Sequence, residues 1–191
     1  MSNQGYEEAI SSLTTDGNAL NTSTTATSLL GASGSAASAS RVTLPAGFFS
    51  WPGKMLKVTA MGRISNIVTT PGTLTLDVRL NAVVAFNGGA MSLNAVAKTN
   101  VSWLLEIYLT CRAIGNGTNA TLMGQGRFTS ESVVSSAAGL PNSLLLPASA
   151  PAVGTGFDST VAQVLDLFGT WSISNAANSI QVHQFVAEAM N

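Results

Sequence analysis

Hydrophobic and polar residues alternate along several stretches of the chain, and the clearest of these runs from Thr73 to Leu80. Leucine or valine occupies every second position there, at 74, 76, 78 and 80, and polar side chains fill the positions between them. Because successive side chains of a strand point to opposite faces, this period of two predicts a strand with one buried face. Half-buried strands of this kind are typical of antiparallel sheets.

The same alternation predicts other strands, over residues 56–64, 101–111, 120–124, 165–173 and 180–186. Short polar and glycine-containing sequences separate the strands and predict turns at 71–72, 81–82, 115–117 and 175–178. A further chain reversal is expected at Asn87-Gly88-Gly89, since asparagine and glycine tolerate the positive φ of tight hairpin turns. We therefore expect two hairpins, one that joins 101–111 to 120–124 and a C-terminal one that joins 165–173 to 180–186.

The number and spacing of the predicted strands indicate an all-β fold. About nine or ten short strands, with turn signals roughly every 8–12 residues, are typical of a sandwich or a jelly roll. Residues 131–160 interrupt the pattern with prolines and glycines, and they predict a long loop with a short strand at 144–146. We expect residues 41–191 to form one antiparallel β-sandwich of jelly-roll type.

The first forty residues differ from the rest of the chain. Residues 1–22 are expected to form an N-terminal arm, with one or two turns of helix between Tyr6 and Leu13. A helix that short is marginal in water, so a neighbour or the sandwich should order the arm. Its apolar side chains Tyr6, Ile10 and Leu13 are therefore candidate interface residues. Residues 23–40 are expected to contain a possible first strand and a flexible linker, GASGSAASAS at 31–40.

Charged residues are scarce, and this changes what is expected of the surface. The chain of 191 residues is 46% hydrophobic but 9% charged, with a net charge of −1, whereas about 25% charged residues is usual in soluble domains. A surface so poor in charge is weakly protected against association, which favours a surface that partners cover. The alternative is a stable monomer that its many Ser, Thr and Asn side chains solvate adequately.

Several partners and locations are not expected. The eight basic residues are scattered singly, which argues against a nucleic-acid partner. No apolar run approaches the roughly 20 residues that cross a bilayer. The N-terminus lacks the features of a secretory signal, so synthesis in a host cytoplasm is expected. The single cysteine, Cys111, lies in an alternating apolar stretch and is expected to be a buried thiol.

Catalytic chemistry is poorly represented. His183 is the one histidine, it lies in a predicted strand, and the chain has no Gly-x-Ser-x-Gly nucleophile elbow. Zinc needs several His or Cys ligands and calcium needs clustered carboxylates, and the sequence has neither pattern. Glu106 and Asp77 are the formal pair for a glycosidase, although both fit outward positions of strands. Asp158 and Asp166 are close in sequence, which is weak support for a shared site. We expect a protein that is not an enzyme and has no cofactor or metal.

An aromatic cluster, formed by Phe48, Phe49 and Trp51, lies between Pro45 and Pro52. One interpretation is that these rings pack into the core where a strand begins. The other interpretation is that they anchor a subunit interface, where aromatic residues are enriched. We retain all three aromatic residues as candidate interface residues.

Several longer sequences resemble those of a known family. They are MGRISNIVTTPGTLTLDVRL (61–80), FNGGAMSL (86–93), TCRAIGNGT (110–118), LMGQGRFTS (122–130) and APAVGTGFDSTVAQVLDLFGTWSISNAANSIQVHQF (150–185). With these motifs, residues 24–190 resemble a group of small structural proteins of tailed bacteriophages and prophages.

The resemblance implies a virion structural protein with a jelly-roll fold. The first role that it implies is that of a capsid decoration, or cement, protein. Such a protein binds the outside of the head and stabilises contacts between major capsid subunits. It is expected to form a homotrimer on the capsid surface, with itself and the major capsid protein as partners. The alternative is a tail or fibre module, in which the 131–160 loop binds a receptor.

Overall fold

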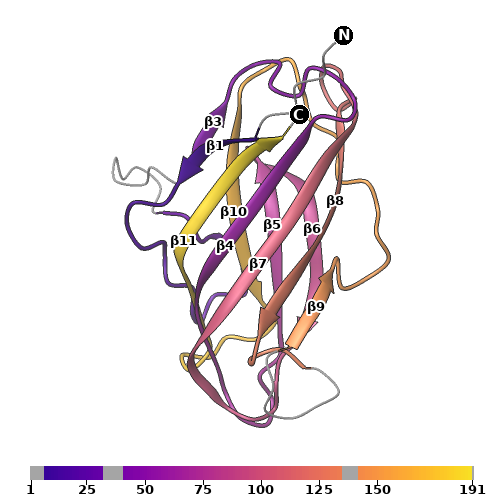
Figure 1. Cartoon of the computed structure of the whole chain (residues 1–191). Coiled ribbons are helices and arrows are strands. Elements are labelled where there is room, and N and C mark those ends of the chain that lie inside the picture. The colour runs from indigo at the N-terminus through magenta and orange to yellow at the C-terminus, as the bar shows by residue number, and fades with distance from the viewer. Residues whose placement is uncertain (1–6, 32–40, 135–141, 191) are drawn as a thin grey trace.

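The computed structural model describes residues 7–31, 41–134 and 142–190 (Figure 1). These residues form eleven strands and no helix, and every pairing between the strands is antiparallel. The strands make two sheets that face one another (Figure 1). Hydrophobic side chains are buried between them. The predicted all-β antiparallel sandwich is therefore confirmed. A helix that could cross a membrane is not found in the described part of the chain.

The first sheet has six strands in the order β1-β11-β4-β7-β8-β9. Its strands are β1 (Glu7–Ser12), β4 (Met55–Asn66), β7 (Lys98–Ala113), β8 (Thr121–Ser130), β9 (Asn142–Leu146) and β11 (Ser179–Met190). The second sheet has the order β2-β10-β5-β6, and β3 also pairs with β10. Its strands are β2 (Thr27–Ser28), β3 (Val42–Leu44), β5 (Thr73–Leu80), β6 (Val83–Ser92) and β10 (Gln163–Trp171). The two central strands of the six-stranded sheet are thus β4 and β7.

The hydrophobic core lies between the sheets and follows from the period of two. In β7 every second residue from Trp103 to Cys111 is buried, and the Cys111 thiol is buried as expected. The two sheets approach closely at Gly124, where a Cβ atom would lie 2.2 Å from Cδ2 of Phe86. Glycine therefore allows the Phe86 ring to pack against β8, in a core with no room for a further methyl group.

The part of the predicted 131–160 loop from residue 142 onward closes one side of the sandwich. Its expected short strand at 144–146 is present as β9. After β9 the chain follows the open edge of β6, where the Ala148 amide donates to the Gly88 carbonyl (2.7 Å). The Gly154 amide then donates to the Leu122 carbonyl of β8 (2.8 Å), so the loop contacts both sheets. These hydrogen bonds cover an edge that would otherwise present unpaired backbone groups.

One predicted chain reversal is wrong. Asn87, Gly88 and Gly89 do not turn the chain, because β6 continues through them as far as Ser92. The two glycines serve the strand in another way. A Cβ atom at Gly88 would lie 2.5 Å from the Leu76 carbonyl oxygen, and Gly89 has a φ of 73°. They therefore allow a close approach and a register shift in the pairing with β5.

The hairpin expected between 101–111 and 120–124 is confirmed as β7 and β8, but the expected C-terminal hairpin is wrong. Strands β10 and β11 lie in different sheets, where their central neighbours are β5 and β4. The connection 172–178 therefore crosses from one sheet to the other. A period of two identifies the buried face of a strand but not its neighbour, so it cannot separate a hairpin from a crossover.

The segment after Tyr6 is a strand, and the short helix expected there is wrong. β1 pairs with the edge of β11, so hydrogen bonds of the sheet replace those of a marginal helix. Leu20 and Leu29 are buried in the core, and β2 lies within the 23–40 region where a first strand was expected. Tyr6 lies outside the described residues, and an arm function of residues 1–22 stays a prediction.

Candidate interaction surfaces

The outer face of the six-stranded sheet exposes large hydrophobic side chains on its two central strands. Met61 of β4 is 41% exposed and Tyr108 of β7 is 42% exposed. The strand register places Leu104 opposite Met61 and Lys57 opposite Tyr108, so these four residues share one surface. Large hydrophobic side chains grouped on an exposed face are typical of a surface that a partner covers.

Several charged side chains on this face form ion pairs. Lys57 Nζ lies 2.8 Å from Glu188 and 3.7 Å from Glu7, and the hydrogen bond with Glu188 raises the pKa of Lys57. Glu106 and Arg127 form a second pair at 2.5 Å. Exposed pairs of this kind contribute little to stability. They leave these parts of the face close to neutral, so another protein surface can cover them without burying an unpaired charge.

A hollow of about 780 Å³ borders Met61 on the same face. Its lining includes His183, which lies at a register shift of β11 between Val182 and Gln184. The Nδ1 atom of His183 is 2.8 Å from Oδ1 of Asp16. This contact connects β11 to the segment that follows β1.

The three aromatic candidates lie together at one end of the sandwich, but they differ in burial. Phe49 is buried in the core, with its ring centroid 5.6 Å from that of Phe157. Phe48 is partly buried, and its ring meets the Phe49 ring edge-on at 5.0 Å. Trp51 is 48% exposed. Core packing thus describes Phe49, whereas Trp51 presents its ring as an interface anchor would.

The described candidates of the N-terminal segment, Ile10 and Leu13, are partly buried against the core. They lie beside β11 at the edge of the six-stranded sheet, where the Leu13 amide donates to the Phe185 carbonyl (2.9 Å). Their side chains therefore help to attach this segment to the sandwich. Tyr6, the third candidate, falls outside the described residues.

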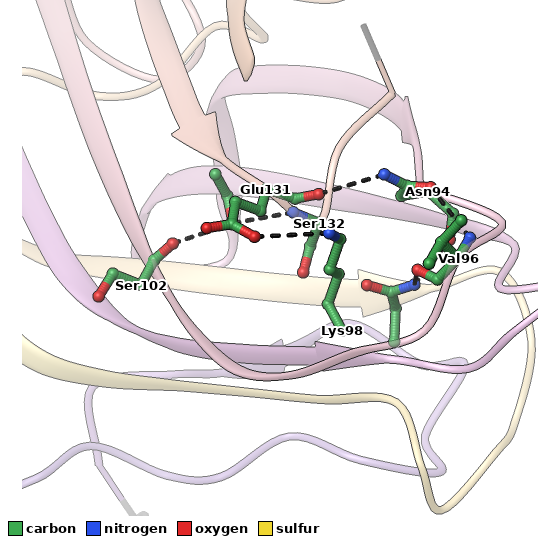
Figure 2. Close-up of polar contacts among 8 residues, drawn as sticks. Asn94, Val96, Lys98, Ser102, Glu131 and Ser132 are labelled. Carbon is green, nitrogen blue, oxygen red and sulfur yellow. Dashed lines mark hydrogen bonds and ion pairs between the residues drawn. The ribbon is translucent and has the colours of Figure 1, made fainter. Parts of the chain in front are cut away.

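Polar side chains fix the loops at the opposite end, where β4 ends and β7 begins (Figure 2). The buried Asn66 side chain donates to the carbonyls of Asn94 (2.7 Å) and Val96 (3.2 Å). The Asn94 side chain donates to the Glu131 carbonyl, and the Glu131 carboxylate lies 3.4 Å from Lys98 Nζ (Figure 2). The network holds the loop in a conformation that leaves Val96 59% exposed.

Two aspartates on the outer face of the five-stranded sheet are buried, and each has an arginine partner. Asp77 and Asp166 are 6% and 5% exposed, and they lie 3.4 Å from Arg79 and 3.1 Å from Arg41. Burial raises the pKa of both carboxyl groups. In the described ranges, no group of three or more His, Cys, Asp or Glu side chains is placed to hold a metal ion. Each carboxylate has an arginine partner, so we interpret the group as structural.

The geometry does not support either carboxylate pair that the sequence suggested. Glu106 lies on the outer face of the six-stranded sheet and Asp77 on the outer face of the other sheet. The core separates them, so they cannot flank one glycosidic bond. Asp158 accepts a hydrogen bond from the Gly117 amide (2.9 Å), whereas Asp166 is bonded to other partners.

Met61, Tyr108 and Lys54 are surface residues that the sequence did not identify as candidates. A signal for the first two was present, because both alternate with buried positions of predicted strands. Only the strand order places them on neighbouring central strands. The position of Lys54 depends on the conformation of the turn that precedes it. Hydrophobic and polar residues do not alternate in this turn, so its conformation could not be predicted from the sequence.

Comparisons of the chain with protein-family models, with curated proteins and with solved structures gave no match. The surfaces described above and the resemblance of the sequence motifs are therefore the basis for a functional proposal.

Proposed function

We propose that the chain is a structural protein of a bacteriophage virion. In this proposal it is a homotrimeric capsid decoration protein on the outside of the head, where it stabilises contacts between major capsid subunits. The main support is the outer face of the six-stranded sheet, with Met61 and Tyr108 exposed on its central strands. Because Lys57 and Glu106 on this face already have ion-pair partners, identical copies can cover this part of the face in a closed assembly. The resemblance of the sequence motifs supports a place in the virion.

The strand pairing supports a jelly roll as the finer description of the sandwich. A jelly roll has eight antiparallel strands in two sheets. The first strand in the sequence pairs with the last, and the other pairs are nested inside this one. Here β1 pairs with β11, β2 and β3 pair with β10, β4 pairs with β7, and β5 pairs with β6. In this description β8 and β9 are an extension at the edge of the six-stranded sheet.

The polar side chains also favour a structural role over a catalytic one. The histidine contacts Asp16, and the two buried aspartates contact Arg79 and Arg41. The contacts of His183 and Asp166 connect segments that are distant in the sequence, and the contact between Asp77 and Arg79 connects two positions of β5. They engage the one histidine and three of the four aspartates, which are groups that an acid–base mechanism would require.

The test of this proposal is the location and copy number of the chain on intact particles. Gold-labelled antibodies against the folded protein should mark the head, and quantitative mass spectrometry should find many copies for each particle. A few copies at the tail would support the alternative role. Absence from purified particles would contradict both roles.

A tail or fibre module is that alternative, and one observation favours it. Val68 and Val96 are each 59% exposed in loops at one end of the sandwich, and Glu7 pairs with Met190 toward the other end. If the chain is attached to the particle at the end that contains Glu7, the two exposed valines lie at the far end. An exposed hydrophobic surface on ordered loops there could bind a receptor. The labelling experiment separates this role from decoration of the head.

A further inference from the structure

The turn that contains Trp51 and Lys54 is fixed to the end of β7. The Gly53 amide donates to the Cys111 carbonyl (2.7 Å), and the Cys111 amide donates to the Lys54 carbonyl (2.9 Å). Gly53 has a φ of 101°, a conformation that other residues rarely adopt. The turn therefore has a defined geometry before any partner binds, which reduces the entropic cost of binding.

Lys54 is held over two aromatic rings of this turn. Its Nζ atom lies 4.5 Å from the Phe48 ring centroid and 5.0 Å from the Trp51 ring centroid. The other two lysines, Lys57 and Lys98, each form an ion pair with a glutamate. Within the described ranges Lys54 forms none. Its charge is thus positioned by cation–π contacts but has no carboxylate partner.

Exposed hydrophobic side chains lie at the same end of the sandwich as this cation. Trp51, Ile114 and Val161 are 48%, 43% and 47% exposed. A hollow of about 410 Å³ lies beside them, and its lining includes Phe49, Ile114 and Thr160. An exposed tryptophan on a rigid turn, with hydrophobic neighbours, has the features of an interface hot spot.

We propose that this aromatic end, defined by Trp51, Lys54, Ile114 and Val161, docks on the major capsid protein at a carboxylate beside an apolar recess. Trp51 enters the recess, and Lys54 forms an ion pair with the carboxylate. The proposal rests on the function proposed above and names the surface that contacts the shell. A protein partner is favoured because membranes and nucleic acids are bound through clusters of basic residues, and the eight basic residues here are scattered.

The test measures binding of the purified full-length protein to capsid shells that lack it. Trp51→Ala and Lys54→Glu are each expected to weaken binding by about tenfold or more. Lys54→Arg keeps the charge and should bind within about twofold of the unchanged protein. Val96→Asp is the matched control, because it changes an exposed hydrophobic residue at the opposite end. Binding of the unchanged protein should weaken at high salt, and Lys54→Glu should lose this dependence.

The outcomes separate this proposal from the proposed function. If the unchanged protein binds shells and both Trp51→Ala and Lys54→Glu bind equally well, docking at the aromatic end is wrong while decoration of the shell stands. Loss of binding in Val96→Asp alone overturns the proposal in favour of the other end. If the unchanged protein binds host glycans and no shells, both proposals are wrong. Circular dichroism checks that each variant is folded. If Trp51→Ala misfolds, Lys54→Glu decides the result, because it changes no core side chain.

Discussion

Asp77 and Arg79 form an ion pair of 3.4 Å on the outer face of the five-stranded sheet, where Asp77 is only 6% exposed. Arg79 also covers the Phe168 ring, with its guanidinium carbon 4.2 Å from the ring centroid. The register places Arg79 opposite Asp166, a second buried carboxylate. Desolvation is the main cause that raises the pKa of both aspartates, and the arginine side chains reduce the shift.

These two carboxyl groups should favour the folded state more at acidic pH than at neutral pH. A group whose pKa is higher in the folded than in the unfolded chain binds its proton more tightly when folded. Its contribution to stability is complete below the unfolded pKa and is lost as the pH rises through the folded pKa. We therefore expect this contribution to be lost as the pH rises above about 4, the ordinary pKa of an aspartate.

Asp77→Asn removes this pH dependence at one of the two sites. The free energy of unfolding of the variant, relative to the unchanged protein, should be higher at about pH 7 than at about pH 4. Urea unfolding at both pH values measures this difference. Glu8→Gln, at an exposed carboxyl group of β1, is the control and should show no such trend. The opposite trend in Asp77→Asn would mean that the ion pair with Arg79 outweighs desolvation.

Gly124 is expected to be indispensable for the packing of the two sheets. In Gly124→Ala the new Cβ atom would lie 2.2 Å from Cδ2 of Phe86, so the sheets or the ring must move. We expect the free energy of unfolding to fall by about 1–3 kcal/mol. Phe86→Leu should recover part of this loss, as measured by urea unfolding of the two single variants and the double variant. Additive losses would show that the two residues do not interact.

Asn178 fixes two loops at the end of the sandwich opposite the aromatic end. It is fully buried, and its side chain donates to the Pro71 carbonyl and accepts from the Ile67 amide, both at 2.9 Å. Asn178→Ala leaves both backbone groups without this partner and should lower the free energy of unfolding by about 2–3 kcal/mol. Asn175→Ala, which removes one exposed hydrogen bond to the Ala177 amide, is the control in thermal unfolding. Equal melting temperatures for the two variants would count against this role of Asn178.

The outer face of the six-stranded sheet is expected to form the contact between copies. Tyr108→Asp places a charge on a central strand of this face and should convert the proposed trimer to monomer. Ala90→Asp introduces the same charge on the outer face of β6 and should leave the trimer intact. Sedimentation velocity at equal protein concentrations measures both. Dissociation by Ala90→Asp alone would assign the contact to the five-stranded sheet.

The positions of most strands could be predicted from the sequence because burial of one face fixes a period of two. The strand expected over Thr73 to Leu80 is β5 with the same bounds, and Asn81 with its φ of 53° forms the expected turn. Strand partners could not be predicted, because pairing depends on contacts between distant segments, and this is why the crossover between β10 and β11 was missed. Burial in the aromatic cluster could not be predicted either, because Phe49 and Trp51 are close in sequence but Phe49 is buried and Trp51 is exposed.

The mass of the purified full-length protein in solution tests most directly whether the chain assembles with copies of itself. Multi-angle light scattering should give about 58.5 kDa, three times the 19.5 kDa of one chain, because the proposed trimer would cover the exposed sheet face. A mass of 19.5 kDa at every concentration measured would contradict the account.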